Sequence, residues 1–255
     1  MPEIDLDGLK IHYESKGSGS SLIFIHGAGN SHMNFKPQFD LLGDGYHVVA
    51  TDLPGHGRSD APKDTKKISI EWYSRILKRF LEGMSIYKAT LVGHSMGGAI
   101  SMQYALVYPQ DVECLVLVST GAKLGVSPVL FSILRSDFKR AIENEYTTRS
   151  AKRVDPELLR EVKAASLLCD PDVGVADFEA CDRFDIRDKI TDIKSPTLII
   201  GADDDNVHPL FWSEFLHENI KGSELKIFSG DFLYTLEKPS EVNDTISNFL
   251  GRHLL

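Results

Sequence analysis

The sequence predicts an α/β fold in which a mostly parallel sheet carries helices on both faces. Short apolar runs at residues 22–25, 46–50, 89–92 and 115–118 are typical of buried strands. Residues 99–107 have helical composition up to Pro109, and strands that alternate with helices at this spacing indicate a parallel sheet. Loops rich in glycine, histidine and serine follow the first three runs, at the strand ends where such sheets bind ligands.

Size and composition are those of a globular protein with one sizeable core. The chain has 255 residues, of which 42% are hydrophobic and 25% charged, so we expect one α/β domain with room for an insertion. The 28 basic and 37 acidic residues give a net charge of −9, which argues against a nucleic-acid partner because phosphate binding needs concentrated lysine and arginine. A small-molecule substrate is the expected partner.

The N-terminus and the cysteines favour a cytoplasmic protein. Residues 1–5 lack the basic and apolar regions of a signal peptide, and no apolar run approaches the length of a membrane span. Cys114, Cys169 and Cys181 have neither metal-ligand nor redox-motif spacing, so we interpret them as free thiols. A disulfide between Cys169 and Cys181 is the alternative, and a reducing compartment disfavours it.

The periodicity changes in the middle of the chain. Helix-like stretches at 129–145 and 156–168 occur there without a convincing strand, which predicts a helical cap over residues 122–190. Strand patterns return at 197–200 and 225–228, and a last amphipathic helix at 240–250 follows Pro239. Residues 1–121 and 191–255 would then form the core that carries the sheet.

Ser95 is the predicted nucleophile. It is the centre of residues 93–97 (GHSMG), directly between a strand pattern and a helix pattern. Glycines two before and two after a serine permit a strained strand-to-helix turn that exposes its hydroxyl. The bare pattern also occurs by chance in loops, but the flanking strand and helix are the context that the motif requires.

Two backbone N–H groups are candidates for an oxyanion hole. The N–H of Met96 follows the nucleophile, and the N–H of Ala28 belongs to the loop after the strand that ends at Ile25. His26, in the same loop, more plausibly hydrogen-bonds loop backbone than transfers a proton. The chain direction points the side chain of His94 away from Ser95, so we assign it to packing or to a place beside the substrate.

Three segments together resemble the α/β-hydrolase superfamily, in particular its carboxylesterase, lactonase and carbon–carbon bond hydrolase branch. They are His26-Gly27 with its small-residue loop, residues 52–60 (DLPGHGRSD) and residues 93–98 (GHSMGG). The resemblance implies a serine hydrolase that forms an acyl-enzyme on Ser95 from a small carboxylic ester, lactone or related carbonyl compound, without a cofactor. Residues 52–60 are interpreted as a structural turn beside the pocket.

The resemblance also implies a triad acid after a later strand. Residues 196–200 lead into Asp203, Asp204 and Asp205, and then Pro209. Counting from Pro196 or back from Pro209 selects Asp205, whereas counting from Gly201 selects Asp204. Asp205 is the preferred candidate, and a solvated acidic turn is a reasonable interpretation for Asp203 alone.

The triad histidine is where the sequence departs from the family pattern. Asp231 stands in the loop after the last strand, where the resemblance implies histidine, and none of the nine histidines lies in that loop. A carboxylate is a weak acceptor for a serine proton, so the sequence predicts a strongly impaired esterase. Three explanations stay open: an introduced His-to-Asp substitution, a divergent enzyme such as a lyase, or a catalytically silent small-molecule binding protein.

The predicted cap suggests what the pocket accepts. Its apolar and aromatic residues favour a small or medium, partly apolar acyl group, although most of them would pack between cap helices. Arg135, Arg140 or Arg183 could recognise a substrate carboxylate, but solvated surface is the simpler interpretation. The scattered histidines and the absence of a glycine-rich phosphate cradle predict neither a metal site nor a nucleotide site.

Overall fold

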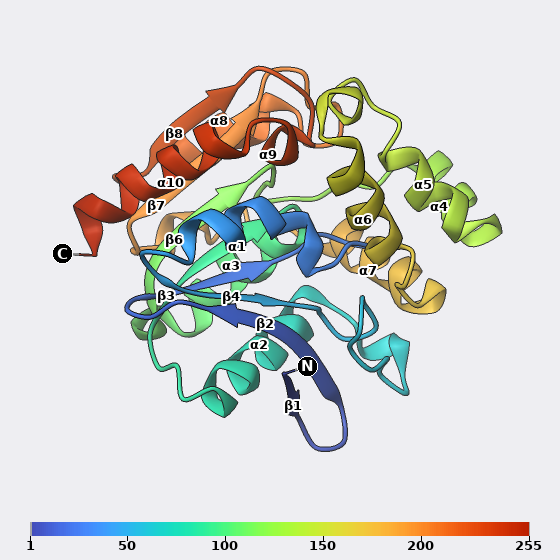
Figure 1. Ribbon diagram of the computed structural model, residues 1–255, viewed down its shortest axis with the longest axis horizontal. Coiled ribbons are helices and arrows are strands. Elements are labelled where there is room, and N and C mark those ends of the chain that lie inside the picture. The colour runs from blue at the N-terminus through green and yellow to red at the C-terminus, as the bar shows by residue number, and fades with distance from the viewer. Residues whose placement is uncertain (1, 255) are drawn as a thin grey trace.

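An eight-stranded sheet forms the centre of the computed structural model, which describes residues 2–254 (Figure 1). The strand order is β1-β2-β4-β3-β5-β6-β7-β8; β1 and β2 pair antiparallel and the other six strands run parallel. The strands are β1 (Glu3–Asp5), β2 (Lys10–Lys16), β3 (Ser21–Ile25), β4 (His47–Thr51), β5 (Ala89–His94), β6 (Val112–Val118), β7 (Thr197–Ala202) and β8 (Glu224–Phe228).

Helices cover both faces of this sheet because neighbouring side chains of each strand point to opposite sides. Leu91 of β5 belongs to the apolar cluster under α2 (Ile70–Gly83), α3 (Met96–Val107) and α8 (Leu210–Asn219), whereas Val92 belongs to the cluster under α1 (Lys36–Leu42) and α10 (Pro239–His253). Both residues are fully buried. The two-sided burial explains why the strands appear in the sequence as continuous apolar runs.

Four helices lie between β6 and β7 in the chain: α4 (Pro128–Ser136), α5 (Phe138–Glu145), α6 (Pro156–Ser166) and α7 (Pro171–Arg183). They gather at one end of the sheet (Figure 1) and contribute to a third apolar cluster. Short 3-10 helices, η4 (Ala151–Arg153) and η5 (Ile190–Asp192), complete this part, together with one isolated bridge between Lys123 and Asp185. We call residues 122–190 the cap segment; its boundaries stay a prediction.

The predicted α/β fold is confirmed, with one difference in the cap segment. The stretch 129–145 is two helices rather than one, because Asp137 leaves the helical conformation (φ −156°, ψ 81°). The Asp137 side chain accepts a hydrogen bond from the N–H of Arg140 and so begins α5. Three further 3-10 helices are η1 (His32–Phe35), η2 (Thr65–Lys67) and η3 (Pro109–Asp111), and a short α9 (Tyr234–Glu237) precedes α10.

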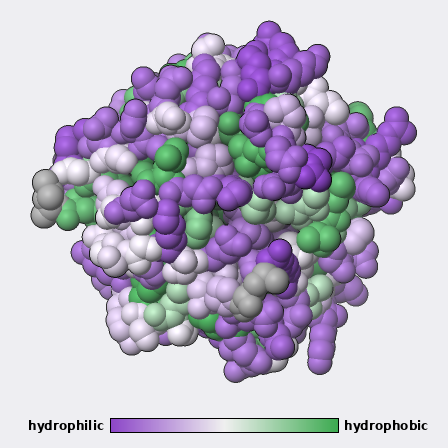
Figure 2. Space-filling model, viewed as in Figure 1, coloured by the Kyte–Doolittle hydropathy of each residue, from purple (hydrophilic) through white to green (hydrophobic). Residues whose placement is uncertain are grey.

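The surface in Figure 2 is mostly hydrophilic, with hydrophobic residues in small separate groups. Among residues 2–254, none of the helices combines the length and the apolar character that a membrane span requires.

Candidate active site

Ser95 lies at the turn between β5 and α3. Its backbone has φ 53° and ψ −116°, a conformation that non-glycine residues rarely adopt. A Cβ atom at position 93 would clash with the carbonyl oxygen of Gly97, and one at position 97 with that of Ile25. The two glycines are therefore required by the close packing of this turn, as the motif predicts.

The side chain next to the Ser95 hydroxyl is an imidazole. His208 Nε2 lies 2.8 Å from Ser95 Oγ, and the His208 side chain is largely buried. His208 is in the loop between β7 and α8, not in the loop after β8. The expectation that Ser95 has no histidine partner is therefore wrong. It assumed that the histidine could come only from position 231.

Asp205 is the acidic residue beside His208. Its Oδ1 accepts hydrogen bonds from the N–H groups of Val207 (2.9 Å) and His208 (2.8 Å), and its Oδ2 lies 3.7 Å from His208 Nδ1. Burial alone would raise the pKa of Asp205, but the hydrogen bonds and the charge of His208 outweigh it and lower that pKa. Asp205 is thus available as a carboxylate at the far side of the imidazole.

The two neighbouring aspartates have other partners. Asp204 is partly exposed and forms an ion pair with Arg149, and the Asp203 carboxylate accepts the N–H of Gly230. Of the three candidates, Asp205 is the one whose carboxylate meets His208. This placement favours Asp205 over Asp204, and its role as the triad acid stays a prediction.

The two residues predicted as oxyanion donors both lie near Ser95. Met96 is the first residue of α3, and Ala28 lines the same pocket as Ser95. A Cβ atom on Gly27 would lie only 3.2 Å from the Cβ of Ser95, so the loop of Ala28 passes close to the nucleophile. The free N–H groups at the beginning of a helix favour negative charge, which suits the role predicted for Met96.

Asp231 connects the core to the cap segment. Its Oδ2 accepts the N–H of Ser150 (2.9 Å), its Oδ1 accepts the N–H of Leu233 (3.1 Å), and its own N–H donates to Ser150 Oγ (3.3 Å). Ser150 is fully buried, and Asp231 is 9% exposed. These contacts give Asp231 a definite structural part where the sequence predicted a substituted catalytic position.

His26 and His94, the two other histidines nearest to Ser95 in the motifs, are both buried. His26 Nε2 accepts the N–H of Leu53, and its Nδ1 donates to the carbonyl of Gly27, which confirms the backbone role expected for it. Burial is the main cause that lowers the pKa of His26 to about 3, and the neighbouring His56 contributes to this decrease. Burial is also the main cause that lowers the pKa of His94 to about 4, with a contribution from His208. Both rings are therefore neutral at neutral pH.

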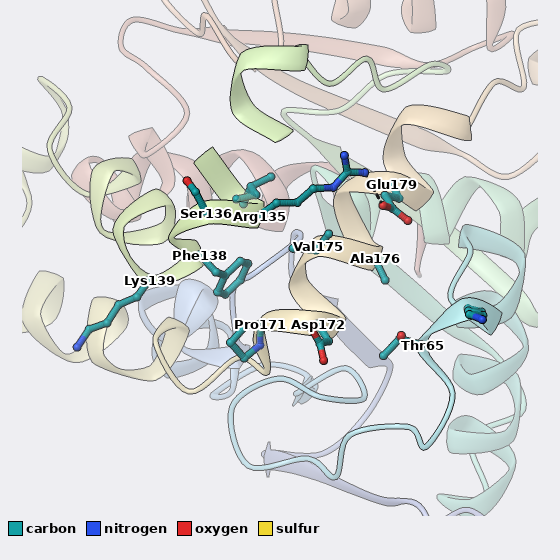
Figure 3. Close-up of a pocket in the computed structure, with 12 residues that line it drawn as sticks. Thr65, Arg135, Ser136, Phe138, Lys139, Pro171, Asp172, Val175, Ala176 and Glu179 are labelled. Carbon is teal, nitrogen blue, oxygen red and sulfur yellow. Dashed lines mark hydrogen bonds and ion pairs between the residues drawn. The ribbon is translucent and has the colours of Figure 1, made fainter. Parts of the chain in front are cut away.

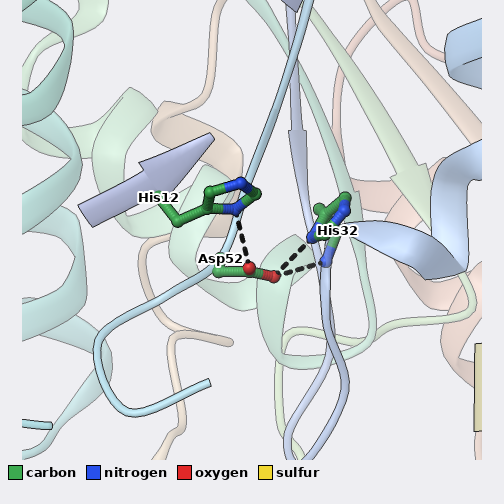
Figure 4. A group of neighbouring side chains, drawn as sticks. All are labelled: His12, His32 and Asp52. Atoms are coloured by element: carbon green, nitrogen blue, oxygen red, sulfur yellow. Dashed lines mark hydrogen bonds and ion pairs between the residues drawn. The ribbon is translucent and has the colours of Figure 1, made fainter. Parts of the chain in front are cut away.

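A second group of histidines meets at the loop of residues 52–60. His12 and His32, scattered in the sequence, donate from their Nδ1 atoms to the two oxygens of Asp52 at 3.0 and 2.8 Å (Figure 4). Burial would raise the pKa of Asp52, but the hydrogen bonds from these two rings hold it well below its usual range.

These three side chains are close enough together to hold a metal ion. Each oxygen of Asp52, however, also accepts one backbone N–H, from His32 or from Arg58. The carboxylate is thus fully used in a hydrogen-bond network that fixes the loop, in agreement with the structural turn predicted for it.

A cavity of about 430 Å³ opens beside Ser95, between the cap segment and the loop of His208. Apolar side chains form most of its wall: Leu124, Val126, Leu130, Phe178 and Trp212. Lys123 also lines it, with its Nζ 3.5 Å from Asp185 Oδ2. The cavity can accept a small or medium apolar group next to the nucleophile.

A separate pocket of about 530 Å³ lies between α4, α5, α7 and the η2 segment (Figure 3). An ion pair between Arg135 and Glu179 (2.8 Å) stands at its edge. Arg135 is therefore on this surface and not among the residues that line the cavity of Ser95. Its lining includes none of the predicted catalytic residues.

Comparison with known proteins agrees with this architecture. Residues 21–165 match the family model described as the alpha/beta hydrolase fold. The chain belongs to this family. It is 28% identical over 277 residues to 2-hydroxy-6-oxo-6-phenylhexa-2,4-dienoate hydrolase from Comamonas testosteroni, an alignment that covers 98% of this chain and 94% of that protein.

Solved structures of α/β hydrolases superpose over nearly the whole chain. One is an enzyme that degrades N-acyl homoserine lactones, with 29% identity, a TM-score of 0.84 and coverage of 97% of this chain and 100% of that one. Another is a thermophilic esterase, with 30% identity, a TM-score of 0.83 and coverage of 98% and 97%. The chain therefore has the scaffold of a hydrolase.

His208 is the site residue that the sequence interpretation missed. The family pattern places the histidine in the loop after the last strand, whereas His208 lies between β7 and α8. A signal was nevertheless present, because His208 follows the predicted acid Asp205 by three residues. A turn of three residues can bring the side chain of His208 back beside the carboxylate of Asp205.

Proposed function

We propose that this protein is an active serine hydrolase that cleaves a small carboxylic ester or lactone through an acyl-enzyme on Ser95. The single observation that carries the proposal is the 2.8 Å contact between Ser95 Oγ and His208 Nε2. A serine hydroxyl becomes nucleophilic when a positioned base accepts its proton, and an imidazole is suited to that role near neutral pH.

In the proposed reaction, Ser95 Oγ attacks the substrate carbonyl while His208 Nε2 accepts the hydroxyl proton. The N–H groups of Ala28 and Met96 donate hydrogen bonds to the negatively charged oxygen of the tetrahedral intermediate. His208 then donates the proton to the leaving alcohol. In the second half of the reaction a water molecule attacks the acyl-enzyme while His208 accepts its proton. His208 returns this proton to Ser95 Oγ as the carboxylic acid leaves. Asp205 faces Nδ1 and stabilises the imidazolium. No step requires a cofactor.

Asp231 has a structural part in this proposal. Its carboxylate anchors Ser150 of the cap segment, and the proposed base of Ser95 is His208, so an aspartate at position 231 is compatible with activity. The catalytically silent interpretation depended on a missing histidine, and His208 removes that reason for it.

The cavity beside Ser95 supports the proposed substrate class. Apolar walls favour a partly apolar acyl group, and about 430 Å³ suits a small or medium one. The lactone-degrading and esterase structures that superpose on this chain support the same class.

The proposal is tested with purified protein and a series of aryl esters of increasing acyl length. We expect hydrolysis by the natural chain, none by Ser95→Ala, and a fluorophosphonate adduct on Ser95 in peptide mass spectrometry. If the natural chain hydrolyses no ester or lactone and Ser95 stays unlabelled, while small carbonyl compounds still raise its melting temperature, a binding function replaces this proposal.

A further inference from the structure

Ser119 occupies a strained position between the strand of the nucleophile and the strand of the acid. It follows β6 directly, is 1% exposed, and has φ 42°, in the left-handed region that favours glycine. Its N–H donates to the carbonyl of Ile200 on β7 (2.9 Å), while the N–H of Ser95 donates to the carbonyl of the preceding residue, Val118 (3.0 Å). Such strain persists where the surroundings enforce it, and it is common at functional sites.

The Ser119 hydroxyl lies near the carboxylate of the proposed triad acid and near the hydroxyl of Tyr234. Three buried atoms at this place, Ser119 Oγ, Asp205 Oδ2 and His208 Nδ1, have no partner within strict hydrogen-bond geometry among the described residues 2–254. The last two lie 3.7 Å apart. Burial raises the pKa of Asp205. The hydrogen bonds and the charge of His208 lower this pKa, and the hydroxyl of Ser119 lowers it further. Buried polar groups are seldom left unpaired, and catalytic hydrogen bonds often tighten only when the substrate reacts.

The short loop between Asp205 and His208 explains why a further donor is useful there. Asp205 Oδ1 is held by two backbone N–H groups of its own loop, those of Val207 and His208. These bonds hold Oδ1, whereas Oδ2 has no donor within strict hydrogen-bond geometry in residues 2–254. A donor from a different strand, opposite Oδ2, would fix the plane of the carboxylate toward the imidazole.

We propose that Ser119 is a positioning residue of the catalytic site, whose hydroxyl donates to Asp205 Oδ2 and holds this oxygen toward His208 Nδ1. The inference rests on the proposed function. When His208 accepts the proton of Ser95, the imidazolium carries a proton on Nδ1, and an aligned carboxylate is what stabilises it. Ser119 acts through Asp205 and does not line the substrate cavity.

The test measures kcat and KM for a short-chain aryl ester across the pH range in Ser119→Ala and Ser119→Gly. Glycine lacks the hydroxyl and suits the positive φ, so it keeps the test valid if alanine impairs folding. We expect kcat to fall about tenfold in both variants, the change that corresponds to one ordinary hydrogen bond, with KM unchanged. The acid limb of the pH profile should move to lower pH, because a less aligned carboxylate stabilises the imidazolium less.

Ser74→Ala is the matched control. Ser74 on α2 is also buried, and its Oγ has no hydrogen-bond partner in the part of the chain that the structure describes. We expect natural kcat and an unchanged pH profile in this variant. If Ser119→Gly has the kcat and the pH profile of the natural chain, the inference is overturned while the proposed function stands. If the natural chain itself lacks hydrolase activity, the proposed function fails first.

Discussion

His208 Nε2 lies 2.8 Å from Ser95 Oγ, although 113 positions separate the two residues in the chain. Ser95 is placed by the turn after β5, and His208 by the loop after β7, so both stand at carboxyl ends of parallel strands. The loop of Ala28 reaches the same edge of the sheet, so Ser95, His208 and Ala28 line one cavity there.

Asp231→Ala should destabilise the protein and leave most of its activity. The substitution removes the acceptor of two buried backbone N–H groups, on Ser150 and Leu233, so we expect the free energy of unfolding to fall by about 1–3 kcal/mol. Urea denaturation measures the loss. Asp231→Asn keeps one acceptor and should lose less. A folded Asp231→Asn variant without any esterase activity would show that this residue takes a direct part in catalysis.

Asp177→Ala should cause a larger loss of stability. Asp177 on α7 is fully buried, accepts the hydroxyl of Tyr73 (2.6 Å), and pairs with His56 Nε2 (2.8 Å). Removing one partner of a buried ion pair leaves the other uncompensated, which costs about 3–5 kcal/mol. Asp172→Ala, an exposed position on the same helix, is the control and should cost less than about 1 kcal/mol. Similar denaturation midpoints for the two variants would contradict the account.

Glu145→Gln should stabilise the protein in a pH-dependent way. Burial raises the pKa of Glu145 to about 8 in the folded chain, above the usual value near 4.5. Between these values the unfolded chain loses the proton and the folded chain keeps it, so the carboxyl costs stability increasingly as pH rises. Glutamine removes that cost. The variant should unfold like the natural chain near pH 4 and gain about 1–3 kcal/mol near pH 8.

Chemical denaturation at several pH values measures this difference. Glu143→Gln, on the same helix and paired with Lys163 (3.6 Å), is the control for the loss of a carboxylate from this helix. A Glu145→Gln advantage that is equal at pH 4 and pH 8 would refute the titration explanation.

Trp212→Ala should change the acyl preference of the proposed enzyme. Trp212 lines the cavity of Ser95, so its loss removes apolar contact with the distal part of an acyl chain. We expect kcat/KM to fall about 10- to 100-fold for a hexanoyl ester and much less for an acetyl ester. Phe211→Ala is a matched control, because its neighbouring ring is 60% exposed and does not line the cavity. Equal losses for both esters would place the acyl group elsewhere.

Local signals explain what the sequence could predict. Continuous apolar runs indicated the buried strands, and the glycines around Ser95 indicated a turn that tolerates no side chain at positions 93 and 97. These features depend on neighbouring residues. The partner of Ser95 depends instead on how two loops meet in space, and the family pattern directed attention to position 231. The same limit applies to His56 and Asp177, whose pairing arises from the packing of α7 against the core.

The most direct test of the central claim is kcat/KM for a short-chain aryl ester in His208→Gln, with circular dichroism to verify the fold. If His208 is the base of Ser95, kcat/KM should fall by a factor on the order of 10⁴ to 10⁶, as for the loss of a triad histidine. Asp231→His should give no gain. A folded His208→Gln variant that hydrolyses the ester at the rate of the natural chain would contradict the account.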